Sequence, residues 1–179
     1  MAQAYVLLDR DGVINQDSDA YIKTPDEWQP IPGSIEAIAL LNEHDFKVVV
    51  ITNQSGLARG LYDRETLEHI HAKMLDLCRQ NNAKIEAIFY CPHLPDDDCT
   101  CRKPKTGLLE QFSNHYQVDL NDIYFVGDTL KDIQAGQSVN ARPLLVKTGK
   151  GLRTIADNPK IDVPIFKDLY HAAQFIISR

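Results

Sequence analysis

The chain has 179 residues, which is enough for one domain with a substantial core and too few for two large domains. Its formal net charge of -6 argues against a nucleic-acid-binding protein, which usually carries a basic surface. No apolar run reaches membrane-spanning length and the first residues lack a signal-peptide pattern, so we expect a cytoplasmic protein whose cysteines stay reduced.

The first predicted strand is the apolar run 4–8, which ends abruptly in Asp9, Asp11 and Gly12. An unbroken apolar run is typical of a strand buried on both faces of a sheet. If the extended backbone continues, both carboxylates point to the same side, which favours a bound cation such as Mg²⁺. The alternative is an ordinary polar turn at a strand end. The polar stretch 15–32 that follows is too long for a simple connection, and such long loops are usually functional.

Apolar runs and amphipathic stretches then alternate along the chain. Ser34 and Asp63 stand where the N-terminal caps of two helices are expected. Strands that alternate with helices predict an α/β fold with a mostly parallel sheet, in a single domain over 1–179. The predicted strands cover residues 4–8, 47–51, 85–90, 122–126, 143–146 and 163–166, and the predicted helices cover 34–44, 63–78, 107–116, 130–138 and 169–177.

Polar residues follow the ends of the first four predicted strands. They are Asp9 and Asp11, then Thr52 and Asn53, then Arg102 and Lys103 after a loop, and finally Asp128. In a parallel sheet these ends meet at one edge, where ligands bind in open α/β folds. The sequence therefore predicts one active site built from all four.

This set of motifs resembles the haloacid dehalogenase (HAD) superfamily of phosphotransferases over nearly the whole chain. The stretch Asp9-Arg10-Asp11-Gly12 looks like its first motif, Thr52 its second, Lys103 its third, and Gly127-Asp128 with Asp132 its fourth. The resemblance implies a Rossmann-like three-layer sandwich, bound Mg²⁺ and a phosphoaspartate intermediate. The spacing between motifs leaves no room for a large cap domain, so the site should be open.

The implied roles agree with the chemistry of the side chains. Asp9 is a carboxylate that needs no base to act as a nucleophile, and Asp11 would protonate the departing oxygen and later activate water. Asp9, Asp128 and the carbonyl of Asp11 would hold Mg²⁺. Thr52 and Lys103 would bind the phosphoryl oxygens.

Each of these residues also has a simpler explanation when it is taken alone. Thr52 and Asn53 could form a turn or a helix cap, and Lys103 could be a solvated surface charge. Asp128 could cap the next helix. Asp132 could lie on the surface or behind the metal ligands.

A second cluster lies in the loop 91–101, where the sequence reads C-x-H-x5-C-x-C. Cys91, His93, Cys99 and Cys101 offer three thiolates and one imidazole, a complete tetrahedral set for structural Zn²⁺. The alternative is a set of reduced loop thiols without metal. By contrast, Thr148-Gly149-Lys150-Gly151 lacks the spacing of a phosphate-binding P-loop and is interpreted as a plain loop.

Within the superfamily, the combination is similar to the histidinol-phosphate phosphatases and the D-glycero-D-manno-heptose 1,7-bisphosphate 7-phosphatases. The resemblance rests on the stretches 9–15, 52–60 and 101–104 and on the metal cluster. It implies that Arg102 recognises the substrate, and its planar fork suits a second phosphate. The resemblance further implies that Asp17, Asn53, Gln54 and Ser55 contact the substrate. Thr129, which follows Asp128, could also contact it, or could simply start the next helix.

The sequence thus predicts a Mg²⁺-dependent phosphoric monoester hydrolase that removes the 7-phosphate of the heptose bisphosphate, in the synthesis of lipopolysaccharide precursors. A histidinol-phosphate phosphatase of the same architecture is one alternative. A zinc-stabilised binding module without catalysis is another, although the residues predicted for nucleophile, acid and metal are intact. We expect a monomer that binds a small sugar bisphosphate, with no nucleic acid or membrane partner.

Overall fold

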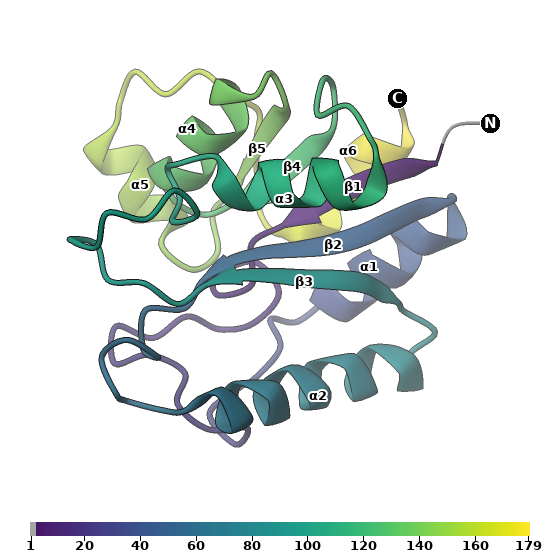
Figure 1. The fold of residues 1–179 in the computed structure, drawn as a ribbon. Helices are drawn as coiled ribbons and strands as arrows, with labels where there is room; N and C mark the ends of the chain where they lie inside the picture. Colours follow the sequence, from purple (N-terminus) through teal and green to yellow (C-terminus); the bar gives the residue numbers. More distant parts are fainter. Residues whose placement is uncertain (1–2) are drawn as a thin grey trace.

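The computed structural model describes residues 3–179, whose strands form one parallel sheet in the order β3-β2-β1-β4-β5-β6 (Figure 1). This confirms the predicted α/β fold. Along the chain the elements are β1 (Ala4–Leu8), α1 (Ser34–Glu43), β2 (Phe46–Asn53), α2 (Arg64–Gln80), β3 (Ile85–Cys91), α3 (Gly107–Tyr116), β4 (Tyr124–Gly127), α4 (Leu130–Ser138), β5 (Arg142–Val146), α5 (Gly151–Asp157), β6 (Ile165–Phe166) and α6 (Leu169–Ile177).

The first strand occupies the middle of the sheet and pairs with β2 on one side and β4 on the other. Alternate side chains of β1 enter opposite layers, as a strand buried on both faces requires. Val6 and Leu8 pack into one apolar core, while Tyr5 and Leu7 pack into the other. The apolar run at the start of the sequence is therefore the central strand of the fold.

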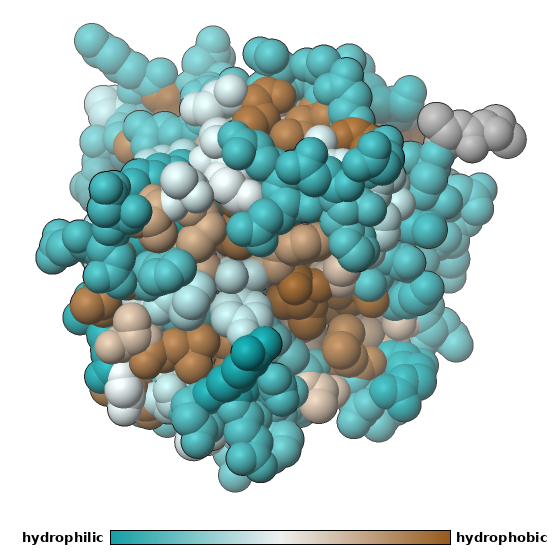
Figure 2. All heavy atoms as spheres, viewed as in Figure 1, coloured by the Kyte–Doolittle hydropathy of each residue, from teal (hydrophilic) through white to brown (hydrophobic). Residues whose placement is uncertain are grey.

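Helices cover both faces of the sheet, which gives the predicted three-layer sandwich. Helices α1, α2 and α6 bury their apolar stripes in the core that contains Ile38, Ile70 and Ile176. Helix α3 packs on the other face through Phe112, and Ala135 of α4 joins the same core. Figure 1 shows α3 and α2 on opposite sides of β3. In the region of Figure 2 where β3 forms the sheet edge, apolar side chains lie between the hydrophilic outer faces of these two helices.

Two helix caps were predicted, and one of them is wrong. Asp63 caps α2 as expected, because its carboxylate accepts a hydrogen bond of 2.8 Å from the Thr66 N–H. Ser34, however, is the first residue of α1, and the capping position is held by Gly33 with φ +84°. The Ser34 hydroxyl instead donates to the Ile14 carbonyl at 2.6 Å and ties α1 to the loop after β1.

The helix α5 was not predicted. The stretch from Thr148 to Gly151 was interpreted as a plain loop, but a helix begins at Gly151. A Cβ at this position would lie 1.8 Å from the Val146 carbonyl oxygen, so the close start of the helix depends on glycine. The helix is short and exposes Leu152, so it lacks the periodic apolar stripe by which the other helices were found.

Two strands are shorter than predicted. β4 starts at Tyr124 because Asp122, with φ +67°, interrupts the extended backbone. β6 covers only Ile165–Phe166, where Pro164 lacks the N–H needed to extend the ladder. No helix among residues 3–179 is long and apolar enough to cross a membrane, and no part of this range forms a separate cap domain.

Candidate active site

The carboxyl ends of β1, β2 and β4 open into a cavity of about 370 Å³. Almost every residue predicted for the site lines it, although the residues come from four separate parts of the chain. The predicted residues at the cavity are Asp9, Asp11, Asp17, Asn53, Gln54, Ser55, Arg102, Lys103, Asp128 and Thr129. Thr52 is fully buried just beneath this surface.

Three buried carboxylates form the base of the cavity. One oxygen atom each from Asp9, Asp128 and Asp132 lies within 4.8 Å of the others, an arrangement that could hold a metal ion. Burial raises the pKa of Asp128 to about 9, and the charges of Asp9 and Asp132 act in the same direction. A cation bound among these groups stabilises their ionised forms.

The two carboxylate oxygens of Asp128 differ in their hydrogen bonding. Its Oδ2 accepts a hydrogen bond of 2.8 Å from the Lys150 N–H. Its Oδ1 is buried and has no hydrogen-bond partner among residues 3–179. Since buried polar atoms are normally satisfied, this oxygen marks the position where a cation fits.

Two glycines allow the chain to close around Asp128. A Cβ on Gly12 would lie 2.0 Å from Asp128 Oδ2, and a Cβ on Gly149 would lie 2.3 Å from the same atom. The Thr148 hydroxyl donates to the Gly12 carbonyl at 2.7 Å and joins the two loops. Glycine is thus required at position 12 because two loops pack closely around Asp128, and not only because the chain turns there.

Lys103 is a buried part of the site, not a solvated surface charge. Its Nζ lies 3.0 Å from Asp9 Oδ1 and 2.7 Å from Asp132 Oδ1, and it donates to the Ile51 carbonyl at 2.8 Å. Burial lowers the pKa of Lys103, but the charges of Asp132 and Asp9 outweigh burial and hold that pKa above its usual value. The lysine is therefore charged and points into the base of the cavity.

The carboxylate of Asp9 is held from two sides. Arg10 donates its backbone N–H to Asp9 Oδ1 at 2.7 Å, and Lys103 pairs with the same oxygen. Burial raises the pKa of Asp9 to about 7, while Lys103 opposes the shift. Asp9 is thus a desolvated carboxylate next to a fixed positive charge, an arrangement that could act as a nucleophile.

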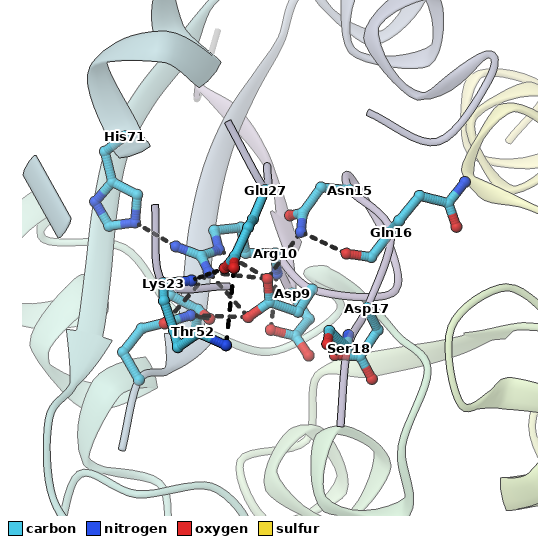
Figure 3. A network of polar contacts seen from close by, with 12 residues as sticks. Asp9, Arg10, Asn15, Gln16, Asp17, Ser18, Lys23, Glu27, Thr52 and His71 are labelled. Carbon is cyan, nitrogen blue, oxygen red and sulfur yellow. Dashed lines mark hydrogen bonds and ion pairs between the residues drawn. The ribbon is translucent and has the colours of Figure 1, made fainter. Parts of the chain in front are cut away.

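Asp11 is held by a different set of partners, two of which, Arg10 and Asn15, are labelled in Figure 3. Its Oδ1 accepts from Arg10 Nη2 at 2.9 Å and from Asn15 Nδ2 at 2.8 Å, and its Oδ2 accepts from Gln54 Nε2 at 2.9 Å. Burial raises the pKa of Asp11, but Arg10 and these hydrogen bonds outweigh burial and leave it below its usual value. The Asp11 carboxylate does not join the three buried carboxylates, so only its carbonyl oxygen is left as its candidate metal ligand.

Thr52, Asn53 and Gln54 have separate tasks at the end of β2. The Thr52 hydroxyl accepts from Gln54 Nε2 at 2.9 Å and keeps its own hydrogen for another acceptor. The Asn53 amide forms two hydrogen bonds of 3.1 Å with the backbone N–H and carbonyl of Lys103. Asn53 therefore positions Lys103, in addition to lining the cavity.

Asp132 and Thr129 pair with each other at the start of α4. Asp132 Oδ2 accepts from the Thr129 N–H at 3.1 Å, which is one half of a capping box, and it also accepts from the Thr129 hydroxyl at 2.8 Å. Because Asp132 also pairs with Lys103, it is buried at the base of the cavity and does not lie on the surface. The Thr129 side chain is engaged by the helix cap, although it borders the cavity.

Two lysines at the cavity were missed by sequence reasoning. Lys131 lines the cavity near Arg102, and neither side chain forms an ion pair with a carboxylate within residues 3–179. Lys150 also lines it and pairs with Asp17 at 3.2 Å and Asp19 at 3.6 Å. The position of Lys131 at the cavity could have been predicted from the sequence, because this residue lies on the first turn of the helix after Asp128. The position of Lys150 could not, since only the fold brings its loop to the site.

The four predicted zinc ligands meet in the loop after β3. Their ligand atoms all lie within 4.8 Å of one another, with Cys91 Sγ 3.8 Å from Cys99 Sγ and His93 Nδ1 3.3 Å from Cys101 Sγ. None of these cysteines is in a disulfide. Distances of this order suit a tetrahedral Zn²⁺ site with sulfur and nitrogen ligands. The Arg102 guanidinium donates to the His93 carbonyl at 3.3 Å, so the cluster borders the cavity.

Comparison with known proteins gives consistent matches over nearly the whole chain. The family model described as polynucleotide kinase 3 phosphatase matches residues 6–147. A D-glycero-beta-D-manno-heptose-1,7-bisphosphate 7-phosphatase of Pseudomonas aeruginosa is 51% identical over 177 residues, with 99% of each chain covered. The protein of the same name from Bordetella bronchiseptica is 52% identical over 151 residues, with 84% of each chain covered.

Solved structures agree with these relatives. The D,D-heptose 1,7-bisphosphate phosphatase of B. bronchiseptica, crystallised with magnesium and phosphate, matches with a TM-score of 0.95 at 46% identity and 98% coverage of each chain. A phosphatase of the same description from Burkholderia thailandensis matches with a TM-score of 0.78 at 37% identity, covering 98% of this chain and 99% of that one. Together with the four motifs around the cavity, these matches show that the chain belongs to the heptose 1,7-bisphosphate phosphatase family of the HAD superfamily.

Proposed function

We propose that the chain is a Mg²⁺-dependent phosphatase that removes the 7-phosphate of D-glycero-beta-D-manno-heptose 1,7-bisphosphate through an aspartyl-phosphate on Asp9. The observation that carries the proposal is the buried group of Asp9, Asp128 and Lys103 at the base of an open cavity. Further basic side chains lie at the mouth of this cavity. Relatives that are 51% identical carry the name of this activity, including its beta anomer.

Asp9, Asp128 and the carbonyl oxygen of Asp11 would hold the Mg²⁺. The free Asp128 Oδ1 supports this assignment, because it has no other partner among residues 3–179. When bound, the ion supplies positive charge that offsets the repulsion between a carboxylate and a phosphate ester. It also favours the ionised form of Asp9, which burial alone disfavours.

The first chemical step is attack by an Asp9 carboxylate oxygen on phosphorus, with loss of the P–O bond to the sugar. Lys103 already points at Asp9 from 3.0 Å, so its charge lies where the phosphoryl oxygens gain negative charge. The Thr52 hydroxyl has its hydrogen available for one of these oxygens. Both groups are buried and fixed before the substrate arrives, which reduces the cost of reorganisation.

Asp11 gives a proton to the departing sugar oxygen and later takes one from the water that hydrolyses the aspartyl-phosphate. In the free protein burial raises its pKa, but the charge of Arg10 and the hydrogen bonds from Asn15, Gln54 and Arg10 together hold that pKa below its usual value. A bound phosphate dianion beside Asp11 raises this pKa, so the acid becomes protonated when the substrate is in place.

The mouth of the cavity favours a substrate with a second phosphate. Arg102 and Lys131 have no carboxylate partner within residues 3–179, so a monophosphate would leave both charges uncompensated. This favours a bisphosphate over histidinol phosphate. Asp17, Asn53, Gln54, Ser55 and Thr129 line the remaining walls where the sugar would lie.

We also propose that Cys91, His93, Cys99 and Cys101 bind one structural Zn²⁺. The closed donor set leaves no open position for catalysis, and the loop has little apolar packing of its own. A cytoplasmic location suits these reduced thiols. Because one copy supplies every residue of the site, the chain would act as a single-domain monomer.

The test is phosphate release with Mg²⁺ from both anomers of the heptose bisphosphate, from histidinol phosphate and from common sugar phosphates. We expect strong preference for the beta heptose bisphosphate, and loss of turnover in Asp9→Asn but not in the exposed loop variant Asp26→Asn. Preference for histidinol phosphate would keep the mechanism and overturn the substrate. No release from any compound, with zinc intact, would instead favour the binding module.

A further inference from the structure

Arg10 is a buried charge to which the proposed mechanism gives no contact with the substrate. It is fully inaccessible to solvent, and it lies behind Asp11, on the side away from the cavity. Its Nε and Nη2 reach Asp11 Oδ1 at 3.1 and 2.9 Å, and Nη2 also lies 3.1 Å from Asp11 Oδ2. The guanidinium therefore holds the whole carboxylate of Asp11 in one orientation.

His71 holds Arg10 from the far side, as Figure 3 shows. Its Nε2 lies 3.1 Å from Arg10 Nη1, and the residue belongs to helix α2, 61 positions along the chain. Because a guanidinium can only donate, Nε2 must accept, and the proton of the neutral ring is on Nδ1. Burial, with Arg10 acting in the same direction, lowers the pKa of His71 to about 3, so the ring stays neutral.

Gln54 connects this pair to the other side of Asp11. Its Oε1 accepts from the Tyr62 hydroxyl at 2.7 Å and from Arg10 Nη2 at 3.3 Å. With the oxygen fixed in this way, the Gln54 amide nitrogen must point to Asp11 Oδ2 and Thr52 Oγ1, both at 2.9 Å. Every polar atom of the amide is used, and its orientation is unique.

The chain makes room for this arrangement at Gly56. A Cβ there would lie 2.2 Å from Cε1 of Tyr62, so the tyrosine ring can reach Gln54 only across a glycine. The network therefore has specific backbone support, in addition to the fit of its side chains.

We infer that Arg10 and His71, supported by Tyr62, are positioning residues that fix the carboxylate of Asp11 for proton transfer to the departing sugar oxygen. The inference rests on the proposed role of Asp11. His71 does not line the cavity, so it acts only through Arg10. Loss of the histidine leaves one guanidinium N–H without an acceptor in a buried position, and Arg10 must shift to find another.

The experiment compares kcat and KM of His71→Leu with those of the unaltered chain, using the heptose bisphosphate and p-nitrophenyl phosphate. Nitrophenolate leaves without a proton, whereas a sugar alkoxide does not. We expect kcat for the sugar substrate to fall about 10- to 100-fold, since small displacements of catalytic groups have effects of this size, with KM changed less than about threefold. The pre-steady-state burst of nitrophenolate, which reports aspartyl-phosphate formation, should keep its rate.

Three further variants separate positioning from folding. His71→Asn retains a hydrogen-bonding side chain and should recover part of the lost kcat, while Tyr62→Phe removes only one hydroxyl and should lower kcat about two- to fivefold. His69→Leu is the matched control, because His69 is exposed on the same helix, and its kcat should be unchanged. Circular dichroism and thermal melting give the folded fraction of each variant.

The inference is overturned if His71→Leu keeps its kcat for the sugar substrate, or if both substrates lose activity in proportion to the unfolded fraction. It is also overturned if the nitrophenolate burst slows as much as sugar turnover. If the unaltered chain releases phosphate and Asp9→Asn does not, the proposed function stands whatever these variants do. A failure of the positioning inference can therefore be distinguished from a failure of the proposed function.

Discussion

Lys103 and Asp132 form an ion pair of 2.7 Å in which the side chains are only 2% and 1% exposed. Few charged groups are buried so completely unless they are paired. Asp132 also accepts hydrogen bonds from the N–H and the hydroxyl of Thr129. It therefore joins the start of α4 to Lys103, which lies beside Asp9. The position of the Lys103 ammonium group at the cavity thus depends on Asp132 as well as on Asp9.

Asp132→Asn should remove this support. Breaking a buried pair costs about 3–5 kcal/mol, so we expect a clear fall in melting temperature together with loss of most phosphatase activity. Differential scanning calorimetry and phosphate release measure the two effects. The exposed Asp162→Asn should change neither. Full activity in Asp132→Asn would mean that Asp9 alone positions Lys103.

Lys131→Met should weaken binding of the second phosphate. The side chain is exposed at the edge of the cavity, and partial desolvation, with the charges of Arg102 and Lys150 acting in the same direction, holds its pKa below the usual value. We expect KM for the heptose bisphosphate to rise about tenfold, equivalent to about 1.4 kcal/mol, while KM for a sugar monophosphate changes little. The exposed Lys160→Met is the control. An equal rise for both substrates would contradict a role at the second phosphate.

Removal of the zinc ligands should destabilise the loop 91–101. Cys99→Ser breaks the closed set of four donors, and the purified variant should hold less than one Zn²⁺ per chain by elemental analysis. We expect the melting temperature to fall by about 5–10 °C, which corresponds to a few kcal/mol in a domain of this size. Cys78→Ala lies on α2 outside the cluster and should keep its zinc. Equal zinc content in both variants would refute the assigned ligands.

The buried neutral His71 should make stability depend on pH. Its pKa is about 3 in the folded chain and 6.5 when unfolded, so between these values the unfolded chain binds more protons. The contribution of neutral His71 to the free energy of unfolding is therefore complete above pH 6.5. It decreases as pH falls toward 3, by up to about 1.4 kcal/mol per pH unit.

Urea unfolding at pH 5 and pH 7 measures this effect. The difference in unfolding free energy between the two pH values should be smaller in His71→Gln than in the unaltered chain. His44→Gln, at the exposed end of α1, should leave the difference as it is. An unchanged pH dependence in His71→Gln would show that another group is responsible.

Gly12→Ala should damage the metal site directly. Its Cβ would lie 2.0 Å from Asp128 Oδ2, so the carboxylate must move, and φ of +85° adds backbone strain. We expect a loss of activity and a rise of at least about tenfold in the Mg²⁺ concentration for half-maximal activity.

Gly60→Ala provides a matched control for this effect. Gly60 has a similar φ of +69°, but a Cβ there would meet nothing within 4 Å. It should therefore show only the stability cost of the left-handed backbone, about 1 kcal/mol, with normal Mg²⁺ dependence. Similar Mg²⁺ dependence in both variants would remove the proposed link between Gly12 and the metal.

The sequence allowed accurate prediction wherever the signal was local. The helices at 107–116, 130–138 and 169–177 have the predicted bounds, because each carries an apolar stripe and a clear start. The strand-end residues were found because parallel strands bring their carboxyl ends together. Local pattern and topology together were enough to place Asp9, Lys103 and Asp128 at one site.

The parts that were missed depend on long-range contacts. Arg10 and His71 are 61 positions apart, and Lys150 meets Asp17 only because the loop after β5 lies over the loop after β1. Neither contact leaves a periodic or spacing signal in the chain. Buried charges such as Asp132 were also underestimated, since composition alone places most aspartates at the surface.

The hydrogen bond between Thr148 and Gly12 has a consequence for how the enzyme is made. It spans 136 positions and closes the loops on either side of Asp128. During translation, β1 leaves the ribosome long before Thr148 is joined to the chain. A growing polypeptide therefore carries Asp9 and Asp11 before the loop that encloses Asp128 exists, and the cavity is complete only after β5 and its loop have emerged.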